Sequence, residues 1–191
     1  MTGRLGTRYI APMRFMSVLA AVACPWLVAC SSSSFITEVK GETTVPASPP
    51  GVETPLNAFP AISSFAALDF DQNQDFKNQG ISKSDVKGVQ VRSVTLKMLG
   101  PNDQDLRFLD ALEFFARAGD RQSRLAHREG IAEVQLSLPN PELPLRTEDV
   151  DLRDFVAAPT MGIIVRGSGR LPEKEVRLQA TVVLDVAVSL L

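Results

Sequence analysis

The chain has 191 residues, of which 45% are hydrophobic and 22% charged, a composition that excludes a wholly disordered protein and suits one folded domain. Its formal net charge of −2, from 20 basic and 22 acidic residues, gives no electrostatic reason to bind nucleic acid. Both cysteines, Cys24 and Cys30, lie near the start, so the rest of the chain can form neither a disulfide nor a thiolate metal site.

The first 29 residues have the pattern of an export signal. Residues 1–14 are basic and contain no acid, and residues 15–29 are an apolar run interrupted by Pro25. A membrane-spanning helix needs about 20 apolar residues, so this run predicts a cleaved signal peptide over residues 1–29. The true start is Met1 or Met13. Removal of three of the 20 basic residues leaves 17 basic against 22 acidic side chains.

The tetrapeptide Leu27-Val28-Ala29-Cys30, followed by four serines, resembles the lipobox of bacterial lipoprotein precursors. The competing Ala21-Val22-Ala23-Cys24 lacks the large aliphatic residue and precedes Pro25. The resemblance implies acylation (palmitate-type chains) of Cys30, and Ser31 after it implies an outer-membrane address, with the periplasmic or surface side left open. Buried acyl chains contribute about 0.8 kcal/mol per methylene, enough for a lasting membrane anchor. The alternative is an ordinary signal peptide with Cys30 as a bystander thiol.

Residues 30–57 are rich in serine, threonine and proline and have no sustained apolar period. This composition predicts a disordered tether between the anchor and the folded domain.

Residues 58–191 alternate apolar and polar positions with period two, which predicts an all-β antiparallel sandwich of about seven or eight strands, immunoglobulin-like or jelly-roll-like. The clearest run, Lys174–Leu190, has apolar residues at its even positions and is long enough to bend or change sheets. Strands are also expected within 62–70, 89–98, 112–117, 124–128, 132–138 and 161–165. A phase flip predicts a β-bulge near Arg92–Ser93.

Short helical turns and a hairpin complete the expected elements. Residues 75–80, 82–87 and 151–156 suit single helical turns, the second with Ser82 as N-cap and Asp85 three residues later. Gly167-Ser168-Gly169 is expected to form a hairpin turn rather than a phosphate-binding loop.

A second, less specific resemblance covers residues 60–190. The segments Asp105-Leu106-Arg107 and Asp151-Leu152-Arg153, together with the long terminal strand, look like uncharacterised bacterial envelope lipoproteins with β-sandwich domains. This resemblance implies a fold and no activity.

One acidic stretch suggests a cation site. Asp69, Asp71 and Asp75 resemble the start of a calcium loop, although Gln74 and Gly80 stand where an EF-hand needs glycine and glutamate. The stretch is therefore either a looser calcium site or a solvated turn. No other cofactor is expected.

Signals for catalysis are sparse. His127, the only histidine, could form a triad with Ser123, but no Gly-x-Ser-x-Gly elbow is present. The only tryptophan and tyrosine lie in the leader, which disfavours carbohydrate stacking. Arg117, Arg121, Arg124 and Arg128 are either a solvated face or a contact for an acidic partner.

These observations favour a non-enzymatic envelope lipoprotein held in the membrane through Cys30. Its β-sandwich would act as a binding or interaction module, with an envelope protein as its expected partner. The alternatives are a cation- or carbohydrate-binding sandwich and, least favoured, an envelope hydrolase.

Overall fold

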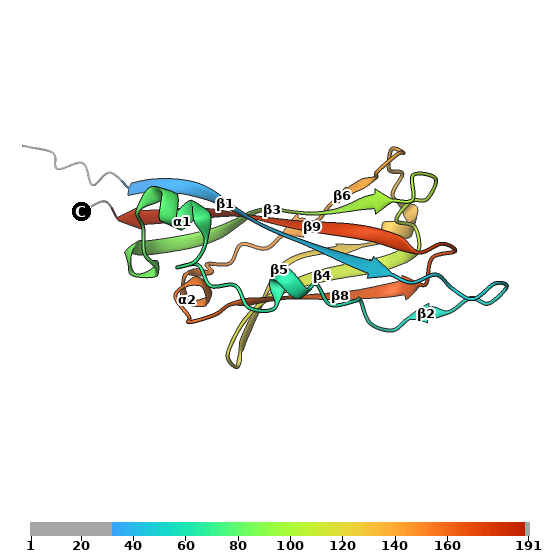
Figure 1. Ribbon diagram of the computed structural model, residues 1–191, viewed down its shortest axis with the longest axis horizontal. Coiled ribbons are helices and arrows are strands. Elements are labelled where there is room, and N and C mark those ends of the chain that lie inside the picture. The colour runs from blue at the N-terminus through green and yellow to red at the C-terminus, as the bar shows by residue number, and fades with distance from the viewer. Residues whose placement is uncertain (1–31, 190–191) are drawn as a thin grey trace, which may run out of the picture. The chain divides into compact units, whose positions relative to one another are not determined.

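The computed structural model describes residues 32–189, which form two antiparallel β-sheets packed face to face (Figure 1). The four-stranded sheet has the order β1 (Ser32–Val45), β9 (Val176–Ser189), β3 (Val86–Gly100), β6 (Glu142–Pro144). The five-stranded sheet has the order β2 (Pro55–Leu56), β8 (Gly162–Arg170), β4 (Leu109–Ala118), β5 (Arg121–Glu129), β7 (Arg146–Thr147). The predicted all-β sandwich is confirmed.

The strand order identifies the fold as a jelly roll rather than an immunoglobulin-like sandwich. The first strand pairs with the last, β2 with β8, β3 with β6, and β4 with β5. Such pairing arises when one long antiparallel hairpin wraps into two sheets. The two-residue strand β7 is an addition at the edge of the five-stranded sheet.

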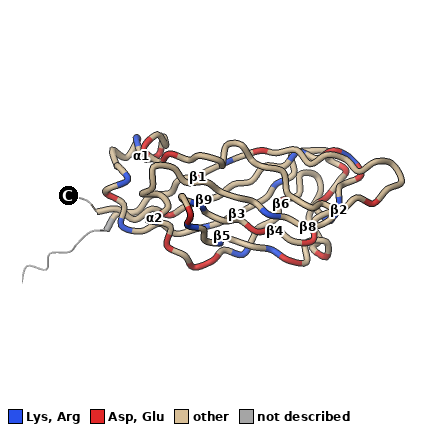
Figure 2. Tube along the Cα trace, turned by 90° about the horizontal axis from the view of Figure 1, so that it is seen from below, with Lys and Arg blue, Asp and Glu red and all other residues tan. Residues whose placement is uncertain are grey.

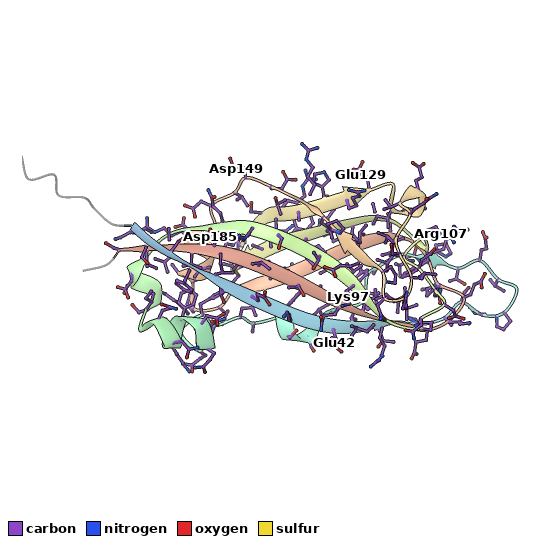
Figure 3. All side chains as sticks on the ribbon, turned by 90° about the horizontal axis from the view of Figure 1, so that it is seen from above. Glu42, Lys97, Arg107, Glu129, Asp149 and Asp185 are labelled. Atoms are coloured by element: carbon purple, nitrogen blue, oxygen red, sulfur yellow. The ribbon has the colours of Figure 1, made fainter. Side chains whose placement is uncertain are left out.

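Strand β9 lies between β1 and β3 and has the alternation predicted for it. Its buried residues are the even positions, Val176, Leu178, Ala180, Val182, Leu184, Val186 and Val188. Each of these valine and leucine side chains contributes about 1.5–3 kcal/mol through removal from water. Of the two alternatives expected for this long run, bending is confirmed, since β9 stays in one sheet and curves with its neighbours (Figure 3).

The predicted disordered tether is wrong for most of its length. Residues Ser32–Val45 form strand β1, which pairs with β9 without a register shift from Ser32↔Ser189 to Val45↔Val176. Its inward positions include Thr37 and Gly41, which weaken the apolar signal although both are buried. Backbone hydrogen bonding to β9 supplies the stability that the composition does not indicate.

Three other sequence predictions are wrong. Two segments predicted as strands are loops with short helices, and one predicted turn lies inside a strand. Residues 62–70 contain the short helix η1 (Ser63–Phe65) and a single bridge, Leu68↔Met161. Residues 132–138 begin inside η3 (Ile131–Glu133) and continue as a loop without strand pairing. Gly167-Ser168-Gly169 lies inside β8, where Gly169 has φ +151° and a Cβ would meet the Phe108 carbonyl at 2.2 Å.

Several local expectations are confirmed. The register between β3 and β9 shifts between Val91 and Ser93, at the predicted bulge. Ser82 and Asp85 form a capping box at η2 (Lys83–Asp85). The helices α1 (Gln74–Gln79) and α2 (Arg153–Val156) occupy two of the predicted turns. No helix within residues 32–189 is long and apolar enough to cross a membrane.

The chain itself covers both sides of the sandwich. On one side, η1 lies over β1, where a Cβ on Gly41 would come within 2.3 Å of Ile62 and Ser64. On the other side, the chain passes from β6 in one sheet to β7 in the other through buried Leu145. The core between the sheets is thereby closed along both long edges.

The assignment of residues 32–45 to a strand predicts a large effect of one charge at a buried position. Val39→Asp places a carboxylate at a site that is 7% exposed and should lower the unfolding free energy by about 2–4 kcal/mol. Thr44→Asp, at an exposed position of the same strand, should change it by less than about 0.5 kcal/mol. Urea unfolding of both variants tests this, and equal midpoints would instead support a tether.

Candidate functional site

Four crossings between the two sheets gather at one end of the sandwich and enclose a cleft of about 590 Å³. The strands β1, β3, β5 and β8 all end there, since Val45 and Gly100 lie beside the start of β9 and Arg170 lies beside β2. The lining residues are Ser48, Val52, Glu53, Asp103, Gln104, Asp105, Arg107, Phe108, Ala132, Leu138, Arg170, Leu171, Pro172 and Glu173. This cleft lies at the end opposite to Ser32.

Backbone hydrogen bonds hold the β1–β2 loop against the β8–β9 loop. The Ser48 amide donates to the Pro172 carbonyl at 2.8 Å, and the Leu171 amide donates to the Thr54 carbonyl at 2.8 Å. The Ser48 hydroxyl donates to Thr54 Oγ1 at 3.1 Å. Residues 46–54, the second part of the predicted tether, are therefore an ordered wall of the cleft.

The β3–β4 loop forms the opposite wall and is fixed by an Asx turn. The Asp105 carboxylate accepts a hydrogen bond from the Arg107 amide at 3.0 Å, while Leu106 between them is fully buried. The same arrangement recurs at the second Asp-Leu-Arg segment, where Asp151 accepts from the Arg153 amide at 2.9 Å. The repeated tripeptide is thus a local turn with a buried leucine.

Most charged groups of the cleft pair with one another. Arg107 pairs with Asp105 at 2.5 Å and Arg170 with Glu53 at 3.2 Å. Lys174 donates to Asp103 at 2.5 Å, which holds the pKa of the Asp103 carboxyl below its usual value. Basic and acidic residues lie close together at the end that carries β2 (Figure 2). Among the described residues, Glu173 has no ion-pair partner.

Two features of the cleft are exceptional within residues 32–189. Gln104 Oε1 is the buried side-chain acceptor that lacks a hydrogen-bond partner there. Val52 and Leu138, with exposed fractions of 56% and 51%, are two of the three exposed large hydrophobic residues in that range. An unpaired acceptor next to exposed apolar side chains is typical of a binding site without its ligand.

The predicted cation site contains an ammonium group of the protein itself. Lys83 Nζ lies 2.6 Å from Asp69 Oδ1 and 3.3 Å from Asp71 Oδ2. It also donates to the carbonyl oxygens of Ala158 at 3.2 Å and Pro159 at 3.1 Å. Lysine thus takes the position that a cation would hold between two carboxylates and two carbonyls.

Asp75 does not join this cluster. Its Oδ2 accepts a hydrogen bond from the Thr37 hydroxyl of β1 at 2.7 Å, which ties the N-terminal turn of α1 to the sheet. No three His, Cys, Asp or Glu side chains between residues 32 and 189 are grouped as metal ligands. The structure therefore brings together Asp69 and Asp71 and separates Asp75 from them.

Both partners in the lysine cluster have shifted pKa values. The hydrogen bond from Lys83 is the main cause that lowers the pKa of Asp69. Burial by itself lowers the pKa of Lys83, but hydrogen bonds to Asp69 and Asp71 outweigh it and raise that pKa overall. Asp69 and Lys83 are therefore ionised at neutral pH, and the cluster links the segment before α1 and η2 to the segment after α2.

His127 belongs to a surface network rather than to a catalytic triad. Its Nδ1 lies 2.8 Å from Glu148 Oε1, which also accepts from Arg124 Nε at 2.8 Å. Burial by itself raises the pKa of Glu148, but the charge of Arg124 and the hydrogen bond with His127 outweigh it, so that pKa is lowered overall. Ser123 lies opposite Ala116, roughly 13 Å along the strand from His127.

The predicted arginine cluster is divided among separate contacts. Arg124 also pairs with Glu113 at 3.1 Å. Arg121 pairs with Asp154 at 3.3 Å and lies over the Phe155 ring at 5.7 Å, and Arg117 donates to the Gly119 carbonyl.

Cys30, the predicted lipidation site, lies outside the described residues, as does the predicted signal peptide. Sequence reasoning missed the cleft residues, because they come from four loops that are distant in sequence. The available signal was local, since Val52 follows the turn sequence Pro49-Pro50-Gly51 and Leu138 directly precedes Pro139.

Comparison with protein-family models and with curated proteins gives no match. Among solved structures, the fold is similar to the decameric BFDV capsid protein, with 10% identity, a TM-score of 0.39, and coverage of 83% of this chain and 99% of that chain. The 60-mer of the BFDV capsid protein gives 8% identity, a TM-score of 0.40, and coverage of 84% and 94%. A structure of Mud crab tombus-like virus gives 10% identity, a TM-score of 0.23, and coverage of 84% and 92%. Scores of this size carry no inference about function.

The lysine cluster predicts a specific loss of stability at acid pH. Because the pKa of Asp69 is lowered on folding, its contribution is complete above its unfolded pKa and is lost as the pH falls through the lower folded value. Lys83→Met should lower the melting temperature at pH 7 by roughly 2–5 °C and flatten its decline below about pH 5.

Lys40→Met, with its ammonium on the exposed Glu38, serves as the matched control and should keep the wild-type pH profile. Thermal melting of the three proteins between pH 3 and pH 7 measures the effect. Millimolar calcium should leave the wild-type midpoint unchanged because Lys83 fills the space between the carboxylates. A rise of the melting midpoint with calcium would instead indicate that Asp69, Asp71 and Asp75 form a cation site.

Proposed function

We propose that this protein is a lipid-anchored lipoprotein of the bacterial outer membrane, and that its β-sandwich is a non-enzymatic binding module with its cleft as the binding surface. The jelly-roll domain provides a rigid support, and acyl chains on Cys30 hold it at the membrane. The observation that carries the proposal is the position of the lipobox relative to the first strand. Cys30 precedes Ser32, the first residue of β1, by two positions.

This spacing favours a domain held directly at the membrane surface. Two residues of fully extended chain span about 7 Å, much less than the roughly 30 Å expected of a 27-residue tether. Strand β1 therefore begins close to the acylated residue, and its backbone is secured by 14 paired positions with β9. Such an arrangement restricts how the domain can orient on the bilayer.

The length of β1 supports a binding surface held away from the lipid. Strand β1 has 14 residues, which at about 3.3 Å per residue cover roughly 40 Å before the loop that lines the cleft. A partner in the envelope space can therefore reach the cleft without contact with the bilayer. Arg107, at the cleft, and Asp185, nearer to the anchored end, lie in opposite halves of the domain in Figure 3.

The charged groups of the cleft support binding rather than catalysis. Asp103, Asp105 and Glu53 are each engaged by Lys174, Arg107 and Arg170 respectively, an arrangement that stabilises loop geometry. Glu173 and the two exposed apolar side chains are instead available for contacts with a partner. This combination of a polar rim, an acceptor and apolar anchors is typical of protein interfaces.

The anchor is tested by Cys30→Ala in cells fed with a clickable palmitate analogue. The variant should lose all acyl labelling and move from the outer-membrane fraction to the soluble fraction, because the only membrane attachment proposed is the acylated thioether. Cys24→Ala is the matched control and should label and fractionate as the wild type does.

Label retained in Cys30→Ala and lost in Cys24→Ala would move the anchor to Cys24. Label absent from the wild type would overturn the lipoprotein assignment. For the binding role, crosslinking in intact cells followed by purification from detergent-solubilised membranes should recover a defined envelope protein, and its yield should fall when the cleft residue Leu138 is replaced by aspartate.

A further inference from the structure

We propose that the cleft binds a segment of a partner protein that presents a lysine or arginine side chain next to an aliphatic residue. This inference rests on the proposed binding role of the cleft and specifies the chemistry of its ligand. It is argued from the unmatched hydrogen-bond acceptors, the charge balance and the apolar rim.

The cleft contains two acceptor groups without a partner among the described residues. The arginines Arg107 and Arg170 already face Asp105 and Glu53, so their charges are compensated within the domain. Gln104 Oε1 is buried without a donor, and the Glu173 carboxylate has no ion-pair partner among the described residues. A buried acceptor left unpaired is unfavourable, and a ligand N–H group would pair with Gln104 Oε1 once that side chain turns toward the cleft.

The net charge of the lining also favours a cation. Four acidic residues line the cleft, Glu53, Asp103, Asp105 and Glu173, against the two arginines. Lys174 compensates Asp103 from outside the lining, and a net negative charge still remains. A phosphate, a carboxylated sugar or a nucleic acid would meet repulsion, whereas an ammonium or guanidinium would be attracted.

The apolar side chains select a ligand with an aliphatic part. Val52 and Leu138 are about half exposed and approach the cleft from the β1–β2 and β5–β6 loops, so each would lose contact with water on binding. Lysine and arginine carry three or four methylene groups below the charged head and bury them readily along apolar surfaces. An aliphatic neighbour in the same segment would cover the second side chain, and about 590 Å³ holds a short peptide.

The experiment measures fluorescence anisotropy of a fluorescein-labelled Leu-Lys-Leu-Lys-Leu peptide titrated with the full chain in detergent. The wild type should bind this peptide at least about tenfold more tightly than the same peptide with glutamine in place of lysine. Gln104→Leu should weaken binding roughly tenfold while leaving the unfolding midpoint unchanged or raised, because it removes a buried unpaired acceptor. A loss of affinity without a loss of stability distinguishes a ligand contact from a purely structural role of Gln104.

Glu173→Gln should weaken binding by roughly threefold to tenfold and reduce its dependence on salt, since it removes an unpaired charge from the cleft. Asp185→Asn, on β9 away from the cleft, removes the same charge and should bind as the wild type does. Equal affinity for the lysine and glutamine peptides, or equal loss in Glu173→Gln and Asp185→Asn, would overturn the proposal.

Spermidine distinguishes a protein segment from a free polyamine, since both carry ammonium groups on aliphatic chains. Spermidine should displace the peptide only at concentrations at least about tenfold above the peptide Kd, and displacement at the peptide Kd would overturn the assignment to a protein segment. Because the titration is done in detergent, failure of Cys30 acylation leaves it unaffected. Failure of peptide binding likewise leaves the acylation result intact.

Discussion

The pairing of β1 with β9 is the interaction on which the rest of the structure depends. It joins Ser32 to Ser189 and continues without a shift to Val45 and Val176, so it brings together the two ends of the described chain. The domain has no disulfide available, and closing so long a loop costs entropy that only contacts across the whole sandwich can offset. Strand β9, paired on both sides and buried at alternate residues, provides those contacts.

The same pairing decides where a binding site can form. Once the chain is folded as a wrapped hairpin, the passages from β1 to β2, β3 to β4, β5 to β6 and β8 to β9 must all cross between sheets at one end. The other end holds the start of β1, together with α1 and α2 (Figure 1). The loops that line the cleft and the start of β1 are thus at opposite ends because of topology, and these loops can differ in sequence without a change in the sheets.

The polar clusters show how similar residue types serve different purposes. Asp69 and Asp71 look like cation ligands, yet their partner is the Lys83 ammonium, which is 12% exposed and links two distant segments. Asp105 and Asp151 cap local turns above buried leucines. At the cleft, by contrast, Gln104 has no partner within the described residues. The candidate site is therefore distinguished by a polar group without a hydrogen-bond partner, and not by a high density of charge.

The sequence by itself determined the features that depend on neighbours in the chain: the alternation of β9, the bulge near Ser93 and the capping box of Ser82. It also predicts the anchor at Cys30, which a linear motif specifies. Only the tertiary structure decided that residues 32–45 are a strand, because Thr37 and Gly41 carry no apolar signal and are buried by α1, η1 and β9. It alone assembled the cleft, because Val52, Gln104 and Leu138 become neighbours only after the sheets have packed.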